Sequence, residues 1–146
     1  MKAVIQRVSK ATVTNIHKDK VVGEIKHGMF VLIGIKKGDT EENVIKLVAK
    51  LKKLRIFEEV EGKMSHSALD LHLPVLVVSQ FTLLADTSGG NRPSFLDAEV
   101  PTRAKKLYEL FIEELRVDLI VETGSFGEYM KINTELDGPV TIVMEI

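Results

Sequence analysis

The chain has 146 residues, and its 20 Lys and Arg against 21 Asp and Glu give a formal net charge of −1. A charge so close to neutral argues against broad, sequence-independent wrapping of nucleic acid, but it is compatible with a small contact to an RNA end. Because there is no cysteine, disulfides, thiolate metal sites and a cysteine nucleophile are excluded.

This length predicts one domain over residues 1–146, and we see no internal repeat or linker that would divide it. The first residues lead straight into AVIQRV, without the basic segment and longer apolar run of a signal peptide. No apolar run reaches membrane-spanning length. We therefore expect a soluble, cytoplasmic protein with no membrane partner.

The first third of the chain is predicted to consist of strands. AVIQRV and ATVTNI are separated by Ser9 and Lys10, and after the polar turn HKDK come VVGEI and the buried strand MFVLIGI. From Asp39 onward the apolar residues recur at the spacing typical of a helix. Asp39 is predicted to cap this helix, with Glu42 three residues on as in a capping box. The apolar stripe of the helix is Val44, Leu47, Val48, Leu51 and Leu54.

The middle of the chain returns to strands and loops. Residues 55–60 are predicted as a strand that turns at Glu61-Gly62, and SHSALDLHL as an irregular connection. PVLVVSQFTLL, from Pro74, is predicted as one buried strand. ADTSGGNRPSF is a loop by composition, because its paired glycines cost much backbone entropy to order. Loops of this kind often carry function.

A second helix is predicted from Pro101, which suits a first helical turn. Its apolar stripe is Ala104, Leu107, Tyr108, Phe111 and Leu115. Residues 118–122, 130–136 and 140–146 are predicted to close the chain as strands. The fold class is therefore α/β, rich in strands, with two main helices covering one face of the sheet system.

The polar residues of SQFTLL are unusual in a buried strand. Strand alternation would place Ser79 and Phe81 on one face and Gln80 and Thr82 on the other. One interpretation is that these polar groups satisfy backbone groups at the end of the strand. The other is a pocket wall in which Gln80 and Thr82 meet a polar ligand. A nucleophilic Thr82 would need a base within hydrogen-bond reach, and no histidine lies nearby in the sequence.

Other polar residues favour ordinary surface roles. The four histidines lie in polar turns or connections and give no metal-binding spacing, so that neither a metal nor a cofactor is expected. They are His17, His27, His66 and His72. Arg92 has a donor fork suited to phosphate or carboxylate, although a solvated loop arginine is the default. Three lysines of the first predicted helix form a solvated face, or else a ridge that contacts phosphates: Lys46, Lys50 and Lys53.

The stretch LDGPVTI combines a hairpin signal with a residue that disturbs it. Asp137-Gly138 is typical of a two-residue hairpin loop, but Pro139 follows where the returning strand would begin to donate hydrogen bonds. One interpretation is a structural turn with a cis bond, which X-Pro bonds commonly carry. The alternative is that the motif presents rigid backbone carbonyls outward as acceptors.

Together these stretches resemble the D-aminoacyl-tRNA deacylase family, also called D-tyrosyl-tRNA deacylases. The combination of SQFTL with DGPVT is highly specific, and the similarity runs along nearly the whole chain. It includes IQRV at 5–8, RIF at 55–57, EGKM at 61–64, NRPSF at 91–95 and TGSFGEYM at 123–130. The resemblance implies a three-layer β/β/α sandwich and a homodimer. It also implies an enzyme that hydrolyses the ester between a D-amino acid, or mischarged glycine, and the 3′ end of tRNA.

The resemblance also implies roles for the strand residues. Ser79, Gln80, Phe81 and Thr82 match the family's pocket strand, where a backbone N–H near Phe81 would bind the scissile carbonyl as an oxyanion-type donor. The chemistry would be assisted by the terminal 2′-OH of the tRNA rather than by a protein nucleophile. The alternatives left open are a non-catalytic dimeric module that binds RNA ends or nucleotides, and a general acyl or peptide hydrolase that uses Thr82.

For the second motif, the resemblance implies a chirality gauge. Gly138 and Pro139 match a cis motif that reaches into the partner's pocket and rejects L-residues with main-chain atoms. Arg7 matches an arginine that orients this motif, and Met130 matches a methionine that lines the pocket of the terminal adenosine. Leu136 stands where the family usually has Asn, but DGPVT itself is intact.

Overall fold

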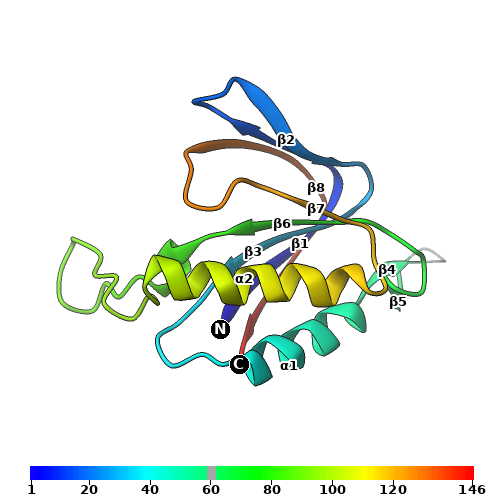
Figure 1. Ribbon diagram of the computed structural model, residues 1–146. Helices are drawn as coiled ribbons and strands as arrows, with labels where there is room; N and C mark the ends of the chain where they lie inside the picture. Colours follow the sequence, from blue (N-terminus) through cyan, green and yellow to red (C-terminus); the bar gives the residue numbers. More distant parts are fainter. Residues whose placement is uncertain (59–61) are drawn as a thin grey trace.

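The computed structural model describes residues 1–58 and 62–146 (Figure 1). The elements along these residues are β1 (Lys2–Asn15), β2 (Lys20–Ile25), β3 (Gly28–Gly34), α1 (Glu41–Lys52), β4 (Arg55–Glu58), β5 (Met64–Ser67), β6 (Val75–Ser79), the 3-10 helix η1 (Phe81–Leu84), α2 (Pro101–Arg116), β7 (Val121–Thr123) and β8 (Met130–Glu145). The predicted strand-rich α/β class with two main helices is confirmed. Within the described residues, no helix is both long and apolar enough to span a membrane.

The long strand β1 organises the main sheet. It pairs antiparallel with β8 along nearly its whole length, with β3 through residues 2–8 and with β2 through residues 11–15. Beyond β3 the sheet continues in parallel through β6 to β7. The hairpin of β4 and β5 forms a separate small sheet. The two helices lie together on one side of the main sheet (Figure 1).

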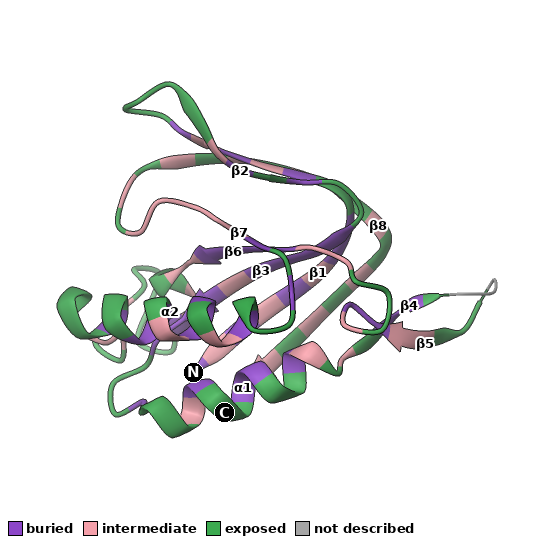
Figure 2. Ribbon diagram, turned by 45° about the vertical axis from the view of Figure 1, so that its right-hand side comes forward, coloured by how far each residue is buried: buried purple, intermediate pink, exposed green. Residues whose placement is uncertain are grey.

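Apolar side chains form two cores, because β3 and β6 are buried on both faces. Alternate residues of these strands point to opposite sides, which explains why both read as nearly continuous apolar runs. The first core packs β3 and β6 against the helices and includes Met29, Val31, Val77, Leu47, Leu51, Phe111 and Leu115. The second lies against the other face and includes Phe30, Leu76, Val78, Val8, Ala11, Val13 and Ile25. Figure 2 shows buried residues concentrated on these central strands.

The start of α1 differs by one residue from the prediction. Thr40, not Asp39, is the N-cap, and the backbone N–H of Thr40 donates to the Asn43 side chain at 2.9 Å. Asn43 therefore takes the position that was predicted for Glu42. The Asp39 carboxylate is engaged elsewhere, because it accepts hydrogen bonds from the Met1 ammonium at 2.7 Å and from the Lys36 N–H at 2.6 Å. The predicted start of α2 at Pro101 is confirmed.

The prediction of one strand for PVLVVSQFTLL is wrong. Strand β6 ends at Ser79, because its neighbour β3 ends at Gly34 and offers little further pairing. The Gln80 N–H still donates to the Ile33 carbonyl at 2.8 Å, but the Leu83 N–H then donates back to the Gln80 carbonyl at 3.3 Å. The chain thus curls into η1. The strand alternation predicted for residues 79–82 does not hold.

Other strand boundaries also differ. AVIQRV and ATVTN form the single strand β1, with no break at Ser9 and Lys10, and Ile16 lies just beyond its end. Part of the predicted irregular connection, residues 65–67, belongs to β5, and the strand predicted at 118–122 begins only at Val121. Residues 130–136 and 140–145 lie in the single strand β8, so that no hairpin forms at Asp137. The predicted strand end at 59–60 and turn residue Glu61 lie outside the described residues.

We predict that Leu47→Ala lowers the free energy of unfolding by about 3 kcal/mol, since it removes a buried side chain and leaves a cavity in the first core. Ile45→Ala is the control on the same helix, where the side chain is 54% exposed and a change below about 0.5 kcal/mol is expected. Urea unfolding followed by circular dichroism measures both. Equal effects of the two substitutions would contradict the described packing of α1.

Candidate active site

The polar segment after β6 is exposed at the end of the sheet. The Ser79 and Gln80 side chains are partly buried, whereas Phe81 is 55% exposed and Thr82 is also exposed. The Gln80 side-chain amide donates to the Thr82 hydroxyl oxygen. Phe81 is the first residue of η1, so that its N–H has no partner within the turn. The segment therefore offers a backbone donor beside two linked polar side chains.

The loop that follows η1 packs back onto this segment. The rings of Phe81 and Phe95 meet edge to face, with centroids 5.0 Å apart and planes at 70°. Asp86 and Ser94 exchange two backbone hydrogen bonds of 2.8 Å, which close the loop at its base. The predicted loop is thereby confirmed, and its NRPSF stretch lies beside the SQFT segment. Arg92, two residues before Ser94, is exposed.

Gly138 and Pro139 lie in a bulge of β8, and the peptide bond between them is cis. On either side of the bulge Gln6 pairs with Thr141 and Val8 pairs with Leu136. Residues 137–140 therefore oppose Arg7 alone, and the extra residues bend out of the ladder. The hairpin signal was misleading here because the neighbouring strand sets the register.

The Arg7 guanidinium holds the base of this bulge. It is 7% exposed, and its Nη1 donates to the Ile56 carbonyl at 2.8 Å and to the Glu58 carboxylate at 3.4 Å. Its Nε donates to the Asp137 carbonyl at 3.3 Å and lies 3.1 Å from the Asp137 carboxylate. Hydrogen bonds from the Gly62 N–H, which has the larger effect, and from Arg7 lower the pKa of Glu58. This carboxylate is therefore ionised at neutral pH. The buried charge of Arg7 and its hydrogen bonds therefore hold the bulge in place through Asp137.

The bulge and the SQFT segment lie far apart within one chain. Ser79 aligns with Ala3 across β3, whereas the bulge is opposite Arg7, four residues further along β1. In addition, β8 and β6 are separated by β1 and β3. With about 4.8 Å between strands and 3.3 Å per residue, the two motifs are roughly 20 Å apart. A single chain does not bring them together.

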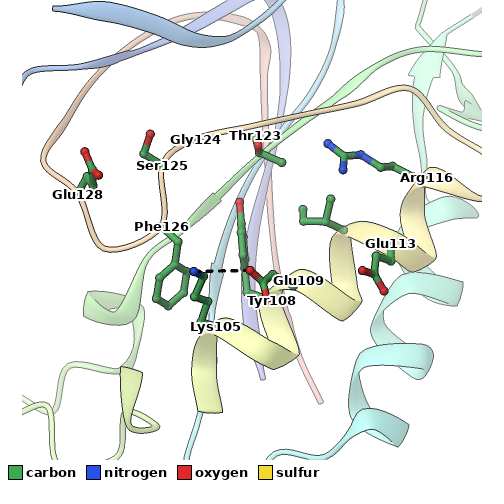
Figure 3. A pocket seen from close by; sticks show the side chains of 11 residues that line it. Lys105, Tyr108, Glu109, Glu113, Arg116, Thr123, Gly124, Ser125, Phe126 and Glu128 are labelled. Carbon is green, nitrogen blue, oxygen red and sulfur yellow. Dashed lines mark ion pairs between the residues drawn. The ribbon is translucent and has the colours of Figure 1, made fainter. Parts of the chain in front are cut away.

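A cleft of about 440 Å³ opens between α2 and the connection from β7 to β8 (Figure 3). Phe126 from the connection and Tyr108 from α2 meet there, with ring centroids 5.5 Å apart. Burial raises the pKa of Tyr108, so that its hydroxyl stays neutral and donates to the Val77 carbonyl at 3.0 Å. Lys105 and Arg116 lie on the α2 side.

Met130 supports this cleft from behind rather than lining it. Its sulfur accepts a hydrogen bond from the Ser125 N–H at 3.1 Å, and a Cβ on Gly124 would lie 2.8 Å from the same sulfur. Sequence reasoning assigned Tyr108 only to the helix core and gave no role to Phe126. An aromatic residue within the short connection TGSFGEYM is the signal that could have indicated a pocket wall.

Two of the predicted surface histidines lie near these sites. His27 Nδ1 is 4.0 Å from the Asp137 carboxylate beside the bulge, and the His17 ring lies 6.5 Å from that of Tyr129 in the connection from β7 to β8. His17, His27 and His72 are exposed, and His66 is partly buried. Among the residues that the structure describes, no three His, Cys, Asp or Glu side chains are grouped so that they could hold a metal ion. Lys46, Lys50 and Lys53 are exposed on or just after α1.

Comparison with known proteins identifies the family of the chain. The family model described as D-Tyr-tRNA(Tyr) deacylase matches residues 4–145. The chain belongs to the D-aminoacyl-tRNA deacylase family. Curated relatives named D-aminoacyl-tRNA deacylase include proteins from Thermosipho melanesiensis, 49% identical, and Aquifex aeolicus, 51% identical. Each alignment covers 99% of this chain and 97% of the relative.

Two solved structures have the same fold over nearly the whole chain. A protein titled "c-Myc DNA Unwinding Element Binding Protein" superposes with a TM-score of 0.93 at 39% identity, over 100% of this chain and 99% of that one. A probable eukaryotic D-amino acid tRNA deacylase superposes with a TM-score of 0.85, covering 99% of this chain and 98% of its own. At 20% identity, this second likeness shows the fold alone.

We predict that Gly138→Ala lowers the free energy of unfolding by about 1–3 kcal/mol, because φ is +119° and an added Cβ would lie 3.0 Å from the Val140 nitrogen and 3.2 Å from Arg7 Nη2. Gly89→Ala is the matched control. A Cβ there would meet nothing within 4 Å, so that a change below about 0.5 kcal/mol is expected. Urea unfolding measures both. A neutral Gly138→Ala would show that the bulge is not held as described.

Proposed function

We propose that the protein hydrolyses the ester bond of D-aminoacyl-tRNA. The observation that carries this proposal is the match over 99% of the chain to relatives named for that activity, at about half identity. In the reaction water adds to the acyl carbon and the bond from that carbon to the ribose oxygen breaks. The products are the free D-amino acid and tRNA with its terminal hydroxyl restored. Mischarged glycyl-tRNA is a second substrate of the same type.

The site works between two copies of the chain. Gly138 and Pro139 lie roughly 20 Å from the SQFT segment of their own chain, so that a second copy must supply one of the two motifs. The outer edge of β8 supports this arrangement, because no other described strand besides β1 pairs with it. Leu136 and Val143 on this strand are 46% and 60% exposed. A long, partly apolar edge strand is a surface that proteins ordinarily cover.

Selection of the D-form uses main-chain atoms. Carbonyls of the bulge at Gly138 and Pro139 accept the substrate's α-ammonium group, and the side chain of an L-residue would then collide with them. Glycine passes because it has no side chain. The role of Arg7 is to keep the bulge in place through its contacts with Asp137, Ile56 and Glu58.

The chemistry takes place at the SQFT segment. The Phe81 N–H donates to the scissile carbonyl oxygen as negative charge develops on it, and Ser79, Gln80 and Thr82 shape the surrounding wall. A threonine nucleophile would need a base, but the Thr82 hydroxyl contacts the side-chain amide of Gln80, which is a donor. The terminal 2′-OH of the tRNA therefore assists the attacking water.

The cleft beside α2 holds the terminal adenosine. Phe126 offers a ring for stacking, and Thr123 and Ser125 offer hydroxyls for the base and ribose. Met130 keeps this wall in place through Ser125. Three lysines lie on or just after α1 rather than on the cleft wall, which favours their interpretation as a solvated face: Lys46, Lys50 and Lys53. With the second copy in place, the architecture is a three-layer β/β/α sandwich dimer acting in the cytoplasm.

With matched D- and L-aminoacyl-tRNA, we expect ester loss from the D-form only, since the selection is steric. Acid-precipitable label on the tRNA measures both rates. Equal rates on the two forms, or none on the D-form, would contradict the proposed function. Binding of the D-form without turnover would instead support a non-catalytic module that binds RNA ends.

The substitution Thr82→Ala is expected to retain most of the activity on D-aminoacyl-tRNA, because the hydroxyl is not the nucleophile. Thr102→Ala, at an exposed position of α2, is the matched control. Single-turnover deacylation gives the rate of the chemical step. A loss of about 10³-fold or more, the scale of removing a catalytic nucleophile or oxyanion donor, would restore the threonine mechanism. Cleavage of small esters by wild type without RNA would point the same way.

A further inference from the structure

Asn15, the last residue of β1, is a fully buried polar side chain near the surface turn that leads to β2. Its amide nitrogen donates to the Ser125 hydroxyl at 3.3 Å and to the Glu128 carboxylate. Its amide oxygen accepts a hydrogen bond from the Lys18 N–H at 3.1 Å. All of these partners lie near the tips of two connections, so that one side chain ties the two together.

The contacts of Asn15 reach the wall of the cleft. Ser125 and Glu128 both line the cleft on the side opposite α2, and Figure 3 shows them on the connection that leads into β8. Lys18 reinforces the tie, since its ammonium lies 3.0 Å from the second oxygen of Glu128. The backbone adds one more bond, from the Ile16 N–H to the Tyr129 carbonyl at 3.1 Å. We call Asn15, Lys18, Ser125 and Glu128 the Asn15 clamp.

We propose that Asn15 is a positioning residue for substrate binding, which sets the cleft wall at Ser125 and Glu128 for the terminal nucleoside of tRNA. This inference rests on the proposed function. Asn15 itself does not line the cleft, so that it acts through the two side chains that it holds. The clamp also restricts the position of Phe126, because this residue lies in the chain between the two anchored residues Ser125 and Glu128.

The chemistry of the clamp explains why the position holds an asparagine. An amide is the one short side chain with two N–H donors and a carbonyl acceptor, and here both functions are used. An aspartate has the same shape, but it would set a second carboxylate against Glu128 and would leave no donor for either wall residue. Hydrogen bonds from the Asn15 amide, which has the larger effect, and from Lys18 lower the pKa of Glu128. That carboxylate therefore stays ionised and accepts these bonds.

A positioning role differs measurably from a general role in stability. If the clamp only stabilised the fold, its loss would lower the folded fraction while the remaining folded molecules bound tRNA normally. If it sets the cleft wall, the folded variant binds the nucleoside poorly. The step at the SQFT segment should then be little affected once substrate is bound. The split between KM and kcat separates the two roles.

The decisive variant is Asn15→Asp, and Thr102→Asp, at an exposed position in the first turn of α2, is the control for the added negative charge. We expect Asn15→Asp to raise KM for D-aminoacyl-tRNA about tenfold or more, the scale of one lost hydrogen bond to a charged group, with kcat changed less than about threefold. Binding of the probe adenosine 5′-monophosphate, measured by calorimetry, should weaken by a similar factor. The control should leave all three values unchanged.

A double variant that exchanges the two side chains distinguishes loss of the clamp from simple misfolding. In Asn15→Asp combined with Glu128→Gln, the carboxylate and the amide exchange places, so that donor and acceptor match again. We expect this double variant to recover KM to within about threefold of wild type. An unchanged KM in a folded Asn15→Asp, a fall in kcat alone, or no recovery in the double variant would overturn the inference. Absence of deacylation by wild type and by the control would overturn the proposed function instead.

Discussion

The structure depends on how β1 pairs with β8, and above all on the interruption of that pairing at Arg7. A guanidinium that is nearly buried must find acceptors for its donors, since an unpaired buried charge is strongly destabilising. A regular ladder would offer few, because strand carbonyls are already paired across the sheet. The bulge at residues 137–140 frees the Asp137 carbonyl and brings the Asp137 carboxylate to the same place. The buried cation and the bulge therefore require each other.

This interaction also joins separate parts of the chain. Arg7 comes from β1, Asp137 from β8, and Ile56 and Glu58 from β4, which lies outside the main sheet. A lysine would not serve equally, because its ammonium lacks the planar fork that reaches these acceptors in different directions. Gly138 then follows with a φ that favours glycine, next to the guanidinium. The motif is rigid because buried charge supports it from below.

Local patterns were sufficient for much of the fold. The two helices follow from apolar spacing and from Pro101, and β3 and β6 follow from their continuous apolar runs. The wrong predictions lie where a neighbouring strand that is distant in sequence determines the local structure. SQFTLL leaves the sheet because β3 ends, and LDGPVTI is a bulge because β1 continues past it. Among the site residues, the contact of Arg7 with the bulge was expected only from family resemblance. Asn15 was missed, because nothing local marks a polar residue at a strand end as buried.

Arg7 and Asn15 have a common feature that ties the two proposed halves of the site together. Both are buried polar side chains on β1, roughly 25 Å apart along the strand at 3.3 Å per residue, and each holds a segment to which we assign a role in the proposed function. Between them Val8, Ala11 and Val13 pack in the second core. A strand that is hydrogen-bonded on both sides and packed in this way moves little, so that it sets the bulge and the cleft wall relative to one frame. The proposed shape selection by backbone atoms requires such a frame, since displacing a selecting carbonyl by about one ångström would weaken its discrimination between a D-residue and its mirror image.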